Sequence, residues 1–266
     1  MIPYPHISPT IIRVGPLAVR WYGLMYILGF ITSWFLFKYQ VKKQKIKALT
    51  DQVVESFYFW LIVALVLGAR LGYVLFYNLG YYVENPLRIF AVWQGGMSFH
   101  GGLLGIIIAG VLFCRKYKLD FWKMADLLAP TVPPALGFGR LGNFINGELY
   151  GRPSNVPWAM VFPQGGNVPR HPSELYEFFC EGILFFIALW ILKDRVKRSG
   201  MMVAAFLILY GVIRFTLEFF RQPDPQLGFV AGPFTMGQLL SSAMVLAGVA
   251  LAIARHKGQA ARDKKK

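Results

Sequence analysis

One short segment concentrates polar groups at the end of an apolar stretch. Residues 139–151 carry Arg140, Asn143, Asn146 and Glu148. Such groups are costly in hydrocarbon, so membrane proteins keep them mainly where they face a cavity and do chemical work. A guanidinium suits phosphate because its planar fork donates two parallel charge-assisted hydrogen bonds. The segment therefore predicts a site for an anionic, phosphate-containing headgroup, with the carboxamides as neutral donors.

Two distant residues could extend this site from binding to catalysis. Arg214 supplies a second guanidinium, which could stabilise a departing phosphate. His100 is followed by Gly101-Gly102, which allow close backbone approach, and could act as a base. A purely structural role also stays open for each of these two residues. Arg214 and Glu218 lie four apart and could form only an intrahelical ion pair, and His100 could be an ordinary satisfied polar residue.

The composition is that of a membrane protein. Of 266 residues, 56% are hydrophobic and only 15% are charged, whereas a soluble domain of this length needs more polar surface. A membrane-spanning helix needs ~20 mostly apolar residues. Seven such runs occur, at about 17–37, 56–77, 97–114, 124–143, 173–192, 201–220 and 233–254. We expect an all-α polytopic protein, a single transmembrane domain over residues 1–266, whose first span is not a cleaved signal peptide.

The lysines predict the orientation of these spans. Every lysine lies in 38–47, 116–123, 193–197 or the tail from residue 257 to Lys266, while the other connections contain only arginine. The lysine-rich side is expected to be cytoplasmic, which places the N-terminus in the periplasm and the C-terminus in the cytoplasm. The net charge of +15 is then a signal of topology and of attraction to anionic lipid, and it does not indicate nucleic-acid binding.

This orientation predicts that polar groups of five spans lie at one level, in the outer half of the membrane. They are Tyr22 and Tyr26 in the first span, Arg70 in the second, His100 in the third, Arg140, Asn143 and Asn146 in the fourth, and Arg214 in the sixth. The long connection within 144–172 is expected to form a periplasmic cap. Tyr22 could instead belong to an interfacial aromatic belt, and Arg70 could neutralise a carboxylate.

For several other residues the sequence predicts structural roles. The pairs Gly68/Gly72 and Gly101/Gly105 are typical of helix packing. Glu177 and Glu181 share a helix face and are expected to pair with arginines, and Asp126 is expected to be a helix-start or packing carboxylate. Cys114 and Cys180 are expected to be reduced thiols, and no Cys/His pattern indicates a metal.

Residues 139–151 resemble the complete signature of the prolipoprotein diacylglyceryl transferases. The similarity extends to four other parts of the chain, namely residues 21–26, 96–102, 170–173 and 214–224. It implies an enzyme of the bacterial cytoplasmic (inner) membrane whose active site faces the periplasmic leaflet. Phosphatidylglycerol would donate its diacylglyceryl group to the lipobox cysteine of a prolipoprotein signal peptide, with no metal or cofactor.

We assign roles to individual residues on this basis, as a hypothesis. For the activation of the thiol one alternative stays open, namely that a substrate phosphate or the local field lowers the pKa of the thiol. His100 would be the general base for a thiol of pKa ~8.5, since an imidazole of pKa ~6.5 can accept its proton. Arg140 would hold the lipid phosphate and Arg214 would neutralise the departing one. The expected substrate-binding set is Arg140, Asn143, Asn146, Glu148, Gly151, Tyr22, Tyr26, Glu218 and Arg221, with Glu218 orienting Arg214.

Two rival functions remain to be tested. A lipid or anion transporter would have polar residues continuing to the cytoplasmic side and internal repeats, and the sequence displays neither. A headgroup hydrolase would use water in place of a thiol. The peptide dependence of product formation distinguishes these functions.

Overall fold

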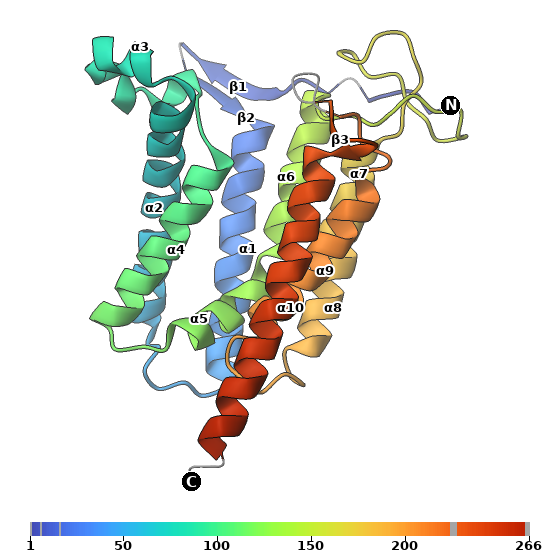
Figure 1. The fold of residues 1–266 in the computed structure, drawn as a ribbon. Helices are drawn as coiled ribbons and strands as arrows, with labels where there is room; N and C mark the ends of the chain where they lie inside the picture. The colour runs from blue at the N-terminus through green and yellow to red at the C-terminus, as the bar shows by residue number, and fades with distance from the viewer. Residues whose placement is uncertain (1, 6, 16, 224–227, 264–266) are drawn as a thin grey trace. The chain divides into compact units, whose positions relative to one another are not determined.

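The computed structural model describes residues 2–5, 7–15, 17–223 and 228–263 (Figure 1). Asp224 of the sixth-span motif and Lys264–Lys266 of the basic tail lie outside this part. The chain divides into two compact units. One comprises Met1–Phe37 with Ala125–Lys266, and the other comprises Lys38–Met124.

Five described helical segments are long and apolar enough to cross a membrane. They are α1 (Trp21–Lys43), α2 (Asp51–Tyr77), α4 (Phe99–Lys116), the continuous run Ser173–Leu192, and Met236–Lys257 of α10 (Met236–Asp263). The run Ser173–Leu192 consists of α7 (Ser173–Glu177), the π-helical turn η4 (Phe178–Leu184) and α8 (Phe185–Leu192). The chain is therefore mostly helical, with the character of a polytopic membrane protein.

The fourth and sixth predicted spans differ from expectation. The fourth is not one helix but α5 (Phe121–Leu128), the 3-10 turn η3 (Ala129–Thr131) and α6 (Pro133–Asn146). Pro130, Pro133 and Pro134 lack the backbone N–H that would continue the hydrogen-bond ladder. The sixth, α9 (Met201–Leu217), is apolar but only 17 residues long. Seven spans and the orientation of the termini stay predictions.

The all-α expectation omitted two small hairpins. Strands β1 (Thr10–Val14) and β2 (Leu17–Arg20) pair antiparallel directly before α1. Strands β3 (Phe229–Ala231) and β4 (Phe234–Thr235) pair in the same way directly before α10. Each hairpin leads the chain into the first turn of a long helix.

In the unit Lys38–Met124, α2 and α4 pack through glycines. A β-carbon added at Gly72 would lie 2.7 Å from the Gly101 Cα, and one added at Gly68 would lie 2.5 Å from the Gly101 carbonyl oxygen and 3.0 Å from the Gly105 Cα. The two shorter distances leave no room for a real side chain, so the two helices approach this closely only because these positions are glycine. The packing role predicted for the glycine pairs is confirmed.

Arg70 organises the connection between these two helices. This connection contains α3 (Leu79–Glu84), η1 (Pro86–Phe90) and η2 (Val92–Gln94). The buried guanidinium donates hydrogen bonds of 2.6 Å to the Arg88 and Gly95 carbonyl oxygens and of 2.8 Å to that of Ile89. Its hydrogen bonds within the described residues all go to carbonyls, so the suggestion that Arg70 neutralises a carboxylate is wrong.

The other unit packs α6 against η4 and α9 against α10. Gly137 of α6 faces Gly182 of η4, where an added β-carbon would lie 2.9 Å from the opposite Cα. Asp126 accepts hydrogen bonds from the backbone N–H groups of Gly200 (2.6 Å) and Val203 (3.0 Å). It therefore caps the start of α9, where Gly200 has no side chain to do so.

The 144–172 connection is anchored by its own apolar cluster. Phe144, Met160 and Phe162 pack with Tyr4 from the N-terminal segment. The Tyr4 hydroxyl also donates a 2.6 Å hydrogen bond to the Phe144 carbonyl oxygen. The connection is therefore fixed to the end of α6, next to the polar residues that the sequence singles out.

Candidate active site

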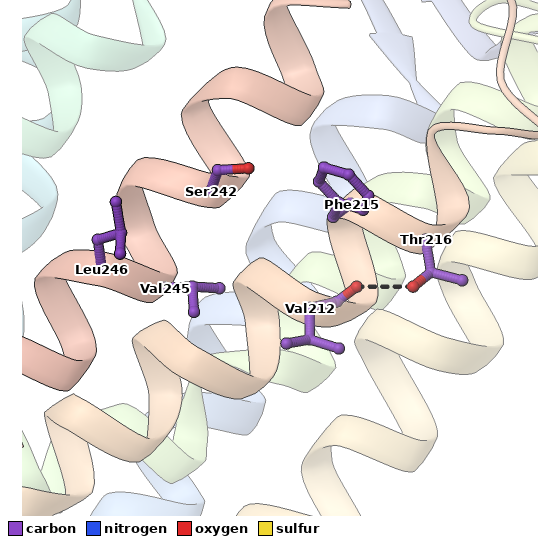
Figure 2. A pocket seen from close by; sticks show the side chains of 6 residues that line it. All are labelled: Val212, Phe215, Thr216, Ser242, Val245 and Leu246. Carbon is purple, nitrogen blue, oxygen red and sulfur yellow. Dashed lines mark hydrogen bonds between the residues drawn. The ribbon is translucent and has the colours of Figure 1, made fainter. Parts of the chain in front are cut away.

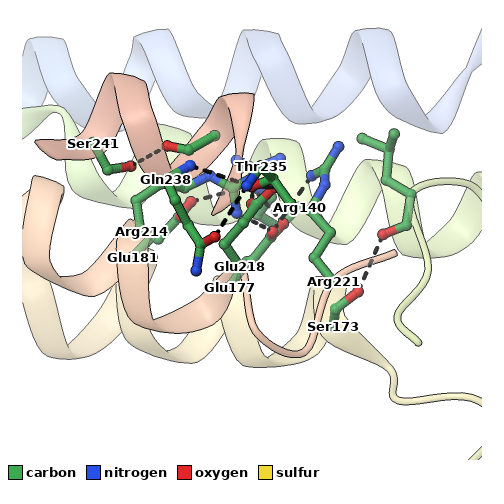
Figure 3. A network of polar contacts seen from close by, with 12 residues as sticks. Arg140, Ser173, Glu177, Glu181, Arg214, Glu218, Arg221, Thr235, Gln238 and Ser241 are labelled. Carbon is green, nitrogen blue, oxygen red and sulfur yellow. Dashed lines mark hydrogen bonds and ion pairs between the residues drawn. The ribbon is translucent and has the colours of Figure 1, made fainter. Parts of the chain in front are cut away.

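A buried carboxylate, that of Glu177, binds three arginines (Figure 3). Arg140 of α6 places its Nε 3.1 Å from Glu177 Oε2. Arg214 of α9 places its Nη1 2.6 Å from Oε1, and Arg221 places its Nη1 3.4 Å from the same oxygen. The side chain of Glu177 is 0% exposed. Residues from α6, α7 and the end of α9 are thereby tied to a single point.

Two further carboxylates complete the charge cluster. Glu181 Oε2 lies 3.1 Å from Arg140 Nε, and Glu218 Oε2 lies 2.6 Å from Arg214 Nη2. The expected pairing of Glu177 and Glu181 with arginines is confirmed, as is the intrahelical pair of Arg214 and Glu218. Ions buried at this depth need such partners, because leaving one of them unpaired is strongly destabilising.

The arginines, and not the carboxylates, form the accessible side of this cluster. The side chains of Arg140 and Arg214 are 19% and 13% exposed, whereas Glu177 and Glu181 are 0% exposed. The ion pairs of Arg140 within the described residues use only its Nε. Its two Nη nitrogens therefore remain to donate to a ligand. An anion approaching the cluster meets guanidinium donors before it meets negative charge.

The end of α6 brings together Asn143, Asn146 and Glu148. Gly147 adopts a left-handed conformation with φ of 66° and ends the helix, so the chain turns back on itself. Glu148 Oε1 then accepts hydrogen bonds from Asn143 Nδ2 (2.9 Å) and Asn146 Nδ2 (3.0 Å). The buried Asn146 Oδ1 has no hydrogen-bond partner among the described residues. A ligand hydroxyl could supply the missing donor.

Tyr22 belongs with α6. A β-carbon added at Gly142 would lie 2.7 Å from Tyr22 Cδ2, so the glycine leaves room for the ring. The Tyr22 and Tyr26 hydroxyl oxygens lie 3.1 Å apart. Tyr22 is half-buried, whereas Tyr26 is exposed. The contact with α6 explains the position of Tyr22 better than an aromatic belt alone.

His100 lies in the other unit, in the first turn of α4. Ser98 caps this helix, since its Oγ accepts a 3.2 Å hydrogen bond from the Gly101 N–H. The His100 side chain is exposed, and its ring centroid lies 5.6 Å from that of Phe99. Its assignment as general base stays a prediction.

Comparison with known proteins identifies the family. The model of the family described as prolipoprotein diacylglyceryl transferase matches residues 9–254. The chain belongs to this family. Phosphatidylglycerol–prolipoprotein diacylglyceryl transferase from Geobacter sulfurreducens is 54% identical over 250 residues, which cover 94% of this chain and 96% of the relative. The enzymes of the same name from Desulfotalea psychrophila and Nitrosospira multiformis are 49% and 50% identical, over 93% and 98% of this chain and 93% and 90% of their own lengths.

Gly151 is the last residue of the 139–151 signature of this diacylglyceryl transferase family member, and it lies where a side chain would have no room. Its N–H donates a 2.9 Å hydrogen bond to the His171 carbonyl oxygen. An added β-carbon would lie 2.6 Å from both His171 Cβ and the Phe220 carbonyl oxygen. Next to it, Arg152 Nε donates a 3.0 Å hydrogen bond to the Arg221 carbonyl oxygen. Gly151 therefore joins the long connection to the segment that carries Arg221.

Several residues of this charge cluster are absent from the residues that the sequence singles out for substrate binding or catalysis. The sequence predicts only that Glu177 pairs with arginines, and it predicts no role for Thr235, whose hydroxyl oxygen lies 3.0 Å from Glu218 Oε1. Acidic residues inside an apolar span were the available signal for Glu177. His171, which the sequence marks only as part of a motif, places Nδ1 3.0 Å from the Tyr176 hydroxyl oxygen, and burial lowers its pKa.

An apolar groove of about 360 Å³ lies between α9 and α10 (Figure 2). Unlike the charge cluster, it is lined by no charged side chain. Its lining consists of Val212, Phe215, Thr216, Ser242, Val245 and Leu246. The two hydroxyls donate to their own helices, from Thr216 to the Val212 carbonyl and from Ser242 to the Gln238 carbonyl. This lining suits hydrocarbon and provides no cation for a phosphate.

Proposed function

We propose that this chain transfers the diacylglyceryl group of phosphatidylglycerol to the lipobox cysteine of prolipoprotein signal peptides. The cysteine sulfur attacks the glycerol carbon that carries the phosphate, and a carbon–sulfur bond forms. The carbon–oxygen bond to the phosphate breaks, and its electron pair leaves with glycerol phosphate. The thiol proton passes to a base. The products are a thioether-linked lipoprotein precursor and glycerol phosphate.

The accessible guanidinium face of the Arg140–Glu177–Arg214 cluster carries this proposal. Arg140 binds the phosphate of the lipid through its two Nη nitrogens, while its Nε remains paired with Glu177 and Glu181. A donor held in advance by buried carboxylates needs no reorganisation as charge develops on the leaving phosphate. Arg214, fixed between Glu177 and Glu218, stabilises that charge.

The carboxamide cluster at the end of α6 binds the glycerol headgroup. Asn146 Oδ1 accepts a hydrogen bond from a headgroup hydroxyl, because it is buried and has no other partner among the described residues. Asn143 and Glu148 hold Asn146 in place through their shared hydrogen bonds. Tyr22 packs beside this cluster. The proposed substrate-binding set also includes Tyr26, Gly151, Glu218 and Arg221.

His100 is the proposed general base that accepts the thiol proton. The proposed reaction takes place in the membrane, where the protein is surrounded by lipids. The site faces the periplasmic leaflet of the inner membrane, because the lysine-rich connections are expected on the cytoplasmic side. The residues 144–172 form a cap on that side. The chemistry proposed here uses amino-acid side chains only.

Incubation of the purified protein in phosphatidylglycerol vesicles with and without a lipobox peptide tests this function. We expect glycerol phosphate and lipidated peptide only when the peptide is present. A peptide whose cysteine is replaced by serine is the matched control. Glycerol phosphate without peptide would establish a hydrolase instead, and no product in either mixture would favour a transporter.

A further inference from the structure

The first turn of α10 carries a reciprocal capping pair that is buried and not exposed to solvent. Thr235 Oγ1 accepts a 3.3 Å hydrogen bond from the Gln238 N–H, and Gln238 Oε1 accepts a 3.1 Å hydrogen bond from the Thr235 N–H. This is the capping box that commonly starts a helix. Thr235 is 2% exposed and Gln238 is 1% exposed. The box therefore lies inside the protein, against the charge cluster.

The Thr235 hydroxyl makes a second hydrogen bond, to a member of that cluster. Its oxygen lies 3.0 Å from Glu218 Oε1 (Figure 3). A hydroxyl has one hydrogen to donate, and an ionised carboxylate can only accept. Because Thr235 accepts from Gln238, its own hydrogen is available for Glu218. One side chain thus links the start of α10 to the end of α9.

Glu218 passes this constraint on to Arg214. Its Oε1 receives the Thr235 hydrogen bond, and its Oε2 lies 2.6 Å from Arg214 Nη2. The Glu218 carboxylate is closely confined as well, since a β-carbon at Gly237 would lie 2.6 Å from Oε1. The carboxylate can therefore rotate little, and together with Glu177 it holds the guanidinium of Arg214 in place.

We propose that Thr235 is a positioning residue for the transfer reaction, whose hydroxyl orients Glu218 so that Glu218 holds Arg214 against the departing phosphate. This inference rests on the proposed function. Small displacements of a catalytic group reduce the rate while leaving substrate binding largely intact. Loss of the Thr235 hydroxyl should therefore lower kcat more than it raises KM for the lipid.

The test compares Thr235→Val, which keeps the shape and removes the hydroxyl, with Thr235→Ser, which keeps the hydroxyl. Both are made in the full chain and assayed in phosphatidylglycerol vesicles with a lipobox peptide. We expect Thr235→Val to lower kcat on the order of 10-fold, with KM for phosphatidylglycerol within about 2-fold, and Thr235→Ser to restore most of kcat. Thr216→Val is the matched control. Thr216 is exposed, and among the described residues its hydroxyl donates only to the Val212 carbonyl oxygen of its own helix α9.

A second comparison separates positioning from helix capping. Gln238→Met removes the glutamine half of the box and leaves the hydrogen bond from Thr235 to Glu218. We expect it to reduce thermal stability but not kcat. Equal losses of kcat in Thr235→Val and Gln238→Met would overturn the proposal, as would wild-type kcat in Thr235→Val. If Thr235→Val does not fold, Thr235→Ala against Thr235→Ser decides on the same criteria. Wild-type protein that forms no thioether would instead refute the proposed function itself.

Discussion

Arg140 and Arg214 bind the two different oxygens of one buried carboxylate. Arg140 Nε lies 3.1 Å from Glu177 Oε2, and Arg214 Nη1 lies 2.6 Å from Oε1. The two guanidinium groups come from α6 and α9, so Glu177 fixes their separation. A phosphate bound by one arginine is therefore presented with the other at a defined position.

Arg140→Lys should abolish most activity although it conserves charge. Lysine lacks the planar fork, so it cannot pair with Glu177 and Glu181 through one nitrogen while offering two others to phosphate. We expect kcat/KM to fall by about 100-fold or more, as when one preorganised donor is removed from a transition state. Thioether formation with a lipobox peptide measures this. The exposed Arg195→Lys provides the control, and activity within 2-fold of wild type would argue against phosphate binding by Arg140.

Glu177→Gln should destabilise the fold as well as the site. It leaves three arginines without the charged carboxylate they share, at a position where the Glu177 side chain is 0% exposed. Breaking a buried ion pair from one side costs about 3–5 kcal/mol, so the midpoint of thermal unfolding in detergent should fall clearly. Glu84→Gln, at an exposed position at the end of α3, should leave it unchanged. A Glu177→Gln protein as stable as the wild type would show that the cluster does not need this charge.

Substitution by alanine should be harmful at only one of the two glycines that begin and end the 139–151 signature. At Gly151 a new β-carbon would lie 2.6 Å from His171 Cβ and from the Phe220 carbonyl oxygen, whereas at Gly139 it meets nothing within 4 Å. We expect Gly151→Ala to lose activity and stability and Gly139→Ala to keep both. Activity assays and thermal unfolding of the two proteins, side by side, check this. A tolerated alanine at Gly151 would contradict the tight packing there.

Asn146→Ala should reduce discrimination between headgroups. If Asn146 Oδ1 accepts from a glycerol hydroxyl, phosphatidylglycerol should be preferred over a phosphatidylpropanol that lacks those hydroxyls. One such hydrogen bond corresponds to about 3–10-fold in kcat/KM, and the variant should lose that preference. Competition between the two lipids measures the ratio. An unchanged ratio in the variant would remove Asn146 from headgroup recognition.

His171 should make stability depend on pH. Burial lowers its pKa in the folded protein, so the folded state favours the neutral ring. The free energy of unfolding is unaffected by His171 above the pKa of about 6.5 that the residue has in the unfolded chain. It decreases as the pH falls from there through the lower pKa of His171 in the folded protein. The thermal midpoint should therefore drop between pH 7.5 and 5.5, and His171→Asn should show a smaller drop. An equal drop in both proteins would assign the effect to other groups.

The apolar runs, and the charged residues inside them, are sufficient to predict most of the long helices and part of the charge cluster. Runs of about 20 apolar residues predict helices without tertiary information, and the spacing of Glu177 and Glu181 places them on one face. The hydrogen bond from Thr235 to Glu218 could not be predicted, since it joins the residue before α10 to the residue after α9, and the relative rotation of these helices depends on side-chain packing. The break between α5 and α6 could have been predicted from Pro130, Pro133 and Pro134, whose effect was outweighed by the apolar pattern.

The π-helical turn η4 makes the length of its span critical. Its widened coil lies between Glu177, which binds the arginines, and the buried core residues Phe185 and Leu189. Each residue of an α-helix advances the chain by about 100° around its axis. Deleting a single residue from η4 would therefore rotate one end of this span against the other. Either the carboxylates or the core side chains would then face the wrong way, although no charged or catalytic residue had been altered.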